Sequence, residues 1–115
     1  MNDTFDQNLK FAMKHLLENF LDLIDEIWLF GSYARRDNHK NSDIDLFIVL
    51  KDPKFNTLQN KRNMINICDP LSGPEIDFIL RNKSPFEYKD SDFQDYSEKL
   101  FIKNVKKDGL KLWPI

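Results

Sequence analysis

Two apolar runs separated by a short polar segment constrain most strongly what this chain can fold into. The first, Ile27 to Phe30, is short, aromatic and branched, and it stops at Gly31, as buried strands do. The second alternates with a period of two, which places Ile44, Leu46, Ile48 and Leu50 on one face and Asp43, Asp45, Phe47 and Val49 on the other. The pattern therefore predicts two strands, the second from about Asp43 to Leu50, joined by a short hairpin-like connection.

Helical periodicity flanks these strands. Apolar residues at steps of three and four predict an amphipathic first helix with a stripe of Phe5, Leu9, Ala12, Leu16, Phe20 and Leu23. Asn56 is predicted to open a weaker helix that ends near Cys68, and a third strand follows from Glu75 to Leu80. Ser91 is predicted to cap a last helix with an apolar side of Phe93, Tyr96, Leu100, Phe101 and Val105. This order predicts an α/β (α+β) fold in which a small mixed β-sheet is flanked by helices.

Composition limits the class of protein. With 115 residues, the chain is expected to form a single domain over residues 1–115, without room for a second core. A net charge of −2 argues against a protein that holds nucleic acid mainly by neutralising phosphates. No apolar run approaches the roughly 20 residues of a membrane span. Cys68 is the single cysteine, which excludes an internal disulfide, and we expect a cytoplasmic protein.

The Gly31-Ser32 pair directly after the first strand is a candidate phosphate-binding turn. Glycine lets the backbone turn tightly and approach a ligand, because it has no Cβ. If a helix starts at Tyr33, its free N–H groups point toward whatever lies beside Ser32. Arg35 lies close enough along the chain to reach the oxygens of a triphosphate.

Three aspartates form the second half of the candidate site. Asp43 and Asp45 are two residues apart on a strand, so their carboxylates share a face and repel each other unless a cation neutralises them. Mg²⁺ is the usual ion in such sites, which it shares with substrate phosphates. Asp77 lies inside the otherwise apolar third strand, where it could complete a two-metal site and accept the proton of an attacking hydroxyl.

Each of these features is ordinary by itself. Gly-Ser pairs occur in many turns, Asp-x-Asp pairs at many strand ends, and Asp77 could face water on an edge strand. Their joint occurrence at fixed spacing, on the predicted elements, is what indicates a common site.

The string GSYARRDNHKNSDIDL, residues 31–46, and the later strand EIDFIL resemble the minimal nucleotidyltransferases of the polymerase-beta-like nucleotidyltransferase superfamily. The resemblance implies the nucleotidyltransferase fold, with Gly31 and Ser32 binding the nucleotide phosphates. It also implies that Asp43 and Asp45 hold Mg²⁺, and that Asp77 is the third metal ligand and the general base. One departure is Arg36, because the family usually has glycine after the arginine of this string.

The function implied is Mg²⁺-dependent transfer of a nucleoside monophosphate, AMP from ATP, to a hydroxyl, with two Mg²⁺ ions and pyrophosphate as the leaving group. Because the chain is short, we expect a separate subunit to grip the acceptor. The resemblance implies a small helical HEPN protein in a hetero-oligomer, a toxin that the chain adenylylates on a tyrosine as its antitoxin. Two alternatives remain open: the catalytic subunit of a two-component enzyme acting on a small molecule, and an antitoxin that binds without catalysis.

Overall fold

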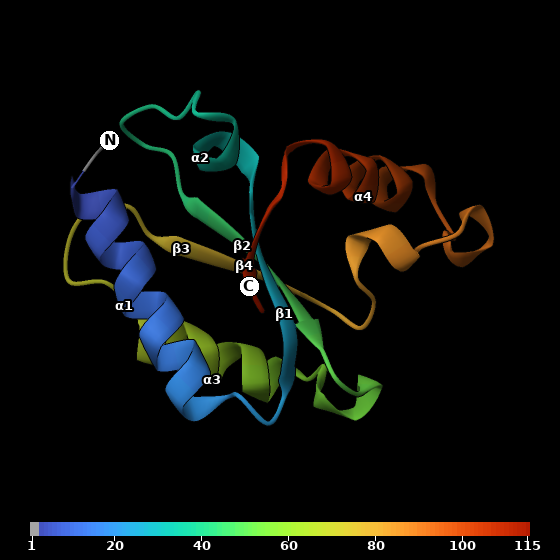
Figure 1. Cartoon of the computed structure of the whole chain (residues 1–115), viewed down its shortest axis with the longest axis horizontal. Helices are drawn as coiled ribbons and strands as arrows, with labels where there is room; N and C mark the ends of the chain where they lie inside the picture. Colours follow the sequence, from blue (N-terminus) through green and yellow to red (C-terminus); the bar gives the residue numbers. More distant parts are fainter. Residues whose placement is uncertain (1–2) are drawn as a thin grey trace.

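A mixed β-sheet lies at the centre of the molecule (Figure 1). The computed structural model describes residues 3–115, and the side chains of residues 5–115. Within them the sheet has four strands in the order β3-β2-β1-β4. The strands are β1 (Ile24–Phe30), β2 (Ile44–Leu50), β3 (Ile76–Arg81) and β4 (Leu110–Trp113). Since β1 runs antiparallel to both β2 and β4 while β2 and β3 are parallel, the predicted mixed sheet is confirmed.

Helices cover both faces of this sheet. In Figure 1, α1 (Asp3–Asn19) and α3 (Leu58–Cys68) lie on one side and α4 (Tyr96–Asp108) on the other. The short α2 (Gly31–Arg35) follows β1 directly, and three 3-10 turns complete the described chain: η1 (Pro53–Phe55), η2 (Pro85–Glu87) and η3 (Asp90–Asp92). No helix in the described part of the chain is long and apolar enough to cross a bilayer.

The alternation of β2 divides the core into two clusters, as the sequence predicts. Ile44, Leu46, Ile48 and Leu50 are buried in one cluster with apolar residues of α1 and α3. Phe47 and Val49 are buried in the other, with Ile102 and Val105 of α4. Because side chains alternate along a strand, Asp45 points to the same face of the sheet as Phe47. The candidate carboxylates therefore belong to the face that α4 covers.

The boundary between the first helix and the first strand differs from the prediction. The helix ends at Asn19 rather than near Leu23, and β1 begins at Ile24 rather than Ile27. Phe20 remains buried in the turn that follows the helix, so the apolar spacing continues past the last helical residue. Charged Asp25 and Glu26 interrupt the apolar pattern of β1 and conceal its first half.

The predicted start of the last helix is wrong. Ser91 lies in η3, and α4 starts behind Asp95, whose carboxylate accepts a hydrogen bond of 2.8 Å from the Glu98 N–H. Tyr96 and Leu100 are 75% and 42% exposed, so they do not form the buried side of the helix. The start of α3 also differs from the prediction, by one residue. Thr57 rather than Asn56 provides the cap, and its hydroxyl accepts from the Asn60 N–H at 3.1 Å.

β4 has no counterpart among the predicted elements. Its four residues follow α4 almost directly and pair with the edge of β1 that β2 leaves free. A segment this short carries little periodicity, so only the open edge of β1 makes it a strand.

Candidate functional site

The antiparallel register of β1 and β2 places Gly31 against Asp45. Phe30 is the strand partner of Asp45, so the next residue lies beside the aspartate. Gly31 has φ 76°, a conformation that favours glycine. A Cβ built at this position would overlap the Asp45 carboxylate, and no other residue type fits without moving it. Gly31 of the predicted phosphate-binding turn thus lies against Asp45, one member of the carboxylate pair.

The parallel register of β2 and β3 places the third aspartate next to the pair. Asp45 and Asp77 are partners on adjacent strands, which lie about 4.8 Å apart in a sheet. Burial, followed by the negative charges of Asp77 and Asp43, raises the pKa of Asp45 to about 6, while Arg35 opposes the increase. The half-buried Asp45 has one carboxylate neighbour, Asp43, directly before its strand and another, Asp77, across the ladder.

The donor chemistry of this cluster suits a hard divalent cation. Three carboxylates, two on adjacent strands and Asp43 directly before β2, provide the oxygen ligands that Mg²⁺ selects. Their mutual repulsion is what such a cation removes. As the side chains stand, no three His, Cys, Asp or Glu side chains among residues 5–115 converge closely enough to hold an ion. Asp43 and Asp77 are both exposed, so their side chains have room to turn toward a cation.

Ser32 and Arg35 lie on α2, which starts at Gly31, two residues earlier than expected, and has only five residues. The Arg35 Nε donates to Asp37 Oδ2 at 3.0 Å, and its Nη1 lies 3.8 Å from Asp108 Oδ2 at the end of α4. The guanidinium therefore links α2 to α4 while remaining 43% exposed. Sequence reasoning missed Asp108, although a carboxylate in the last turn of a helix opposes the helix dipole and signals a cationic partner.

Arg36, the departure from the usual glycine, lies at a position with an unusual backbone conformation. This residue is the C-cap of α2 and has φ 64° and ψ 29°, the left-handed conformation. Its backbone N–H donates to the Tyr33 carbonyl at 3.4 Å. Glycine adopts this conformation without steric cost, so the structure shows what a glycine at this position would provide.

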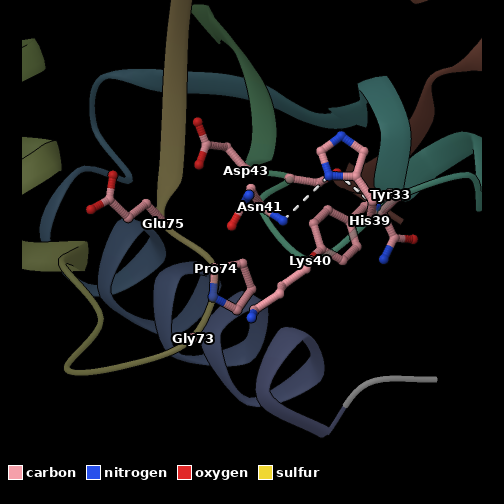
Figure 2. Close-up of a pocket in the computed structure, with 10 residues that line it drawn as sticks. Tyr33, His39, Lys40, Asn41, Asp43, Gly73, Pro74 and Glu75 are labelled. Carbon is pink, nitrogen blue, oxygen red and sulfur yellow. Dashed lines mark hydrogen bonds between the residues drawn. The ribbon is translucent and has the colours of Figure 1, made fainter.

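A polar cavity of about 550 Å³ opens beside Asp43. Residues 38–43, residues 73–75 and Tyr33 line it (Figure 2). Asp43 and Glu75 come together because the Ile44 N–H donates to the Glu75 carbonyl at 2.8 Å. Sequence reasoning did not identify this cavity, and no local signal could have done so, because the two walls are far apart in the chain.

The comparison with known families identifies the class of protein to which this fold belongs. The nucleotidyltransferase domain family matches residues 10–111. The chain belongs to the nucleotidyltransferase domain family, which confirms the family expected from Gly31 to Leu46.

A curated relative is the Methanocaldococcus jannaschii protein named "Putative protein adenylyltransferase MJ0141". The two sequences are 38% identical over 68 residues, which are 59% of this chain and 63% of the relative. The chain thus spans less than two thirds of the relative's length.

Two solved structures share the fold. One is a toxin-antitoxin with AMP-PNP, with a TM-score of 0.64 and 21% identity, covering 92% of this chain and 73% of that one. The other is a mutant of the toxin-antitoxin MntA-HpeT, with a TM-score of 0.61 and 19% identity, covering 94% of this chain and 73% of that one. The expected nucleotidyltransferase fold is confirmed.

Proposed function

We propose that this chain is a Mg²⁺-dependent nucleotidyltransferase that moves AMP from ATP to a hydroxyl, a tyrosine of a partner HEPN toxin that it silences as an antitoxin. The observation that carries the proposal is the register of the sheet, which places Asp77 beside Asp45 and Asp45 against Gly31. The name of the curated relative favours a protein acceptor. A structural neighbour with AMP-PNP favours an adenine nucleotide as the donor.

Each residue has a defined part in this reaction. The backbone at Gly31 and Ser32 binds phosphate oxygens, and Arg35 adds a positive charge that shifts from Asp37 toward the triphosphate. Asp43, Asp45 and Asp77 would hold the Mg²⁺ ions. When bound, Mg²⁺ neutralises the carboxylates and the phosphates and favours ionisation of the acceptor hydroxyl.

The transfer is a displacement at the α-phosphorus of ATP. Asp77 accepts the proton of the acceptor hydroxyl as its oxygen forms a bond to phosphorus. The bond between the α-phosphorus and the bridging oxygen breaks, and pyrophosphate leaves with that electron pair. The chain contributes the alignment of the two reactants and the preorganised charges around them.

The free-energy cost of placing three carboxylates close together argues against an antitoxin that binds its partner without catalysis. The raised pKa of Asp45 shows that its charge is disfavoured in the folded protein, and a surface used only for binding gains nothing from this arrangement. The buried and unpaired thiol of Cys68 fits a reducing compartment, so we place the reaction in the cytoplasm.

Labelled ATP and intact-mass spectrometry test the proposal. The chain, co-purified with its HEPN partner and supplied with Mg²⁺, is expected to add one AMP to a tyrosine of the partner. Asp77→Asn should lower the transfer rate by about 10²- to 10⁴-fold, the usual contribution of a general base. Asp22→Asn is the matched control, because Asp22 is exposed in the turn before β1, at the end of that strand away from Gly31.

Three other outcomes would contradict the proposal. Full transfer by Asp77→Asn would show that Asp77 is not the base. Labelling of a small molecule but not of the partner would favour the two-component enzyme. Neutralisation of the toxin without any transfer, unchanged in a double variant with Asp43→Asn and Asp45→Asn, would identify a non-catalytic antitoxin.

A further inference from the structure

The polar cavity beside Asp43 extends beyond the residues assigned to the nucleotide and shares only Asp43 with them. Among the described residues, its lining includes Asp43 but not Gly31, Ser32 or Arg35. We propose that this cavity receives the acceptor, a polypeptide segment in which an acidic residue flanks the tyrosine and is recognised by Lys40. The inference rests on the proposed function, since it names the acceptor site of that reaction.

The position of the cavity follows from the need for two substrates to meet. The phosphate-binding turn lies against Asp45, so the triphosphate approaches the carboxylates from the β1 side of β2. The cavity reaches Asp43 between two walls, one formed by Tyr33 and residues 38–42 and the other by residues 73–75, which lead into β3. A group bound there lies beside Asp43 and leaves Gly31, Ser32 and Arg35 uncovered for the nucleotide.

Both walls of the cavity are formed in advance. The Asn8 side chain donates to the Ser72 and Pro74 carbonyls at 2.8 and 3.0 Å, which ties the turn before β3 to α1. On the opposite wall, the Ser42 hydroxyl accepts from the His39 N–H at 2.8 Å, and the Ser42 N–H donates to the His39 carbonyl at 3.0 Å. A site held by such contacts loses little conformational entropy when it binds.

The size and place of the cavity suit a peptide. Its volume of about 550 Å³ exceeds that of one side chain and lies within the range of about 300 to 1,000 Å³ for ligand pockets. Beside it, β3 is an edge strand that pairs only with β2. Edge strands offer unpaired backbone groups to an extended peptide.

The charges of the cavity determine which peptide fits. Figure 2 shows the Lys40 side chain running toward Pro74, while the Asp43 and Glu75 side chains lie on the other side, with their carboxylates apart from Lys40. Neither Lys40 nor Glu75 has an ion-pair partner among the side chains of residues 5–115. The free ammonium group therefore attracts a carboxylate of the acceptor, and Glu75 disfavours a second one near Asp43.

Backbone NMR with two synthetic peptides tests this assignment. Both peptides are capped at their ends and carry one tyrosine, flanked by Glu in the first and by Lys in the second. The Glu peptide should shift the amide signals of residues 38–43 and 73–75, whereas AMP-PNP should shift those of residues 31–35. Lys40→Gln should weaken binding of the Glu peptide about two- to fivefold, as expected for an exposed charge pair.

Charge reversal separates recognition from a structural effect. Lys40→Glu should bind the Lys peptide better than the Glu peptide, while Lys103→Gln on α4 should leave the preference unchanged. In the transfer assay, the same reversal should appear in KM for the peptide, with KM for ATP constant.

The possible failures differ for the two proposals. Shifts outside the cavity, competition between peptide and AMP-PNP for the same amides, no shift at millimolar peptide, or an unchanged preference in Lys40→Glu would each overturn the acceptor site. Peptide binding as expected, without AMP transfer to the peptide or to the HEPN partner, would instead overturn the proposed function.

Discussion

Arg36 occupies a backbone conformation that costs free energy for any residue with a Cβ. Its φ of 64° ends α2 directly after Arg35, so the strain lies within the segment that carries the phosphate-binding turn. The chain tolerates this cost because the turn must reverse direction here to bring Asp43 back toward the sheet. The side chain itself is exposed and is not required for the turn.

We predict that Arg36→Gly stabilises the protein. Glycine relieves the strain of the left-handed conformation, and this effect outweighs the additional entropy of glycine in the unfolded chain. The free energy of unfolding should therefore rise by about 0.5 to 1 kcal/mol. The gain is measured as a shift of the urea midpoint. Arg36→Ala keeps a Cβ and should show no gain, so equal effects of Gly and Ala would contradict the explanation.

Asp45 is a second residue that costs folding free energy, because its negative charge is disfavoured in the folded protein. Its pKa is raised from 3.8 to about 6, first by burial and then by Asp77 and Asp43. As pH rises from about 4 to 6, the unfolded chain releases this proton before the folded one, so folding becomes less favourable. The penalty is complete above pH 6 and disappears below the unfolded pKa.

We predict that Asp45→Asn stabilises the metal-free protein at pH 7.5 by about 1 kcal/mol, a value reduced for solvent screening. The gain should shrink as pH falls toward 4.5. Urea unfolding in the presence of EDTA measures it, and Asp22→Asn serves as an exposed control. A gain that is independent of pH would show that charge at this position is not the cause.

At the scale of elements, the caps determine where the helices begin. Asp95 accepts from the Glu98 N–H at 2.8 Å and from the Ser97 hydroxyl at 2.6 Å, so α4 starts at Tyr96. Ser91 has the residue type and spacing of a cap, but it lies in η3. The side chain that meets a free N–H, rather than the residue type, fixes the boundary.

Replacing the two candidate caps should separate them. We expect Asp95→Ala to lower the free energy of unfolding by about 1 kcal/mol, because the first turn of α4 loses its acceptor. Ser91→Ala should have almost no effect. Thermal or urea unfolding measures both, and a larger loss for Ser91→Ala would contradict the assignment.

At the scale of the whole molecule, a small second core attaches α4 to the sheet. Its buried members are Trp28, Phe47, Val49, Ile102 and Val105. A bidentate pair supports it, in which Arg81 of β3 donates to Glu98 of α4 at 2.9 and 3.0 Å. The position of Asp108 against Arg35, and hence the charge around the candidate site, depends on this attachment.

We predict that Ile102→Ala destabilises the protein by about 2 to 4 kcal/mol, because it leaves a cavity under α4. Ile102→Val should cost about 0.5 to 1.5 kcal/mol. Urea unfolding gives the two values. If Ile102→Ala and Ile102→Val lowered the free energy of unfolding by similarly small amounts, the second core would be loosely packed and would not hold α4 in place.

The sequence by itself determined the two strands and the division of β2 into two faces, and it provided the prediction that Gly31, Ser32 and the aspartates form a site. These features depend on local properties: a period of two, the absence of a Cβ at Gly31 and the charge of neighbouring aspartates. The expected family and fold are confirmed for the same reason, since the motif from Gly31 to Leu46 is continuous in the chain.

Only the tertiary structure decided which distant segments meet. It paired Asp77 with Asp45, placed Asp108 against Arg35 and joined residues 38–43 to residues 73–75 around one cavity. It also made a strand of Leu110–Trp113, because β1 offered a free edge. Such pairings depend on strand register and on open sheet edges across the whole fold, and the local periodicity of the sequence does not predict them.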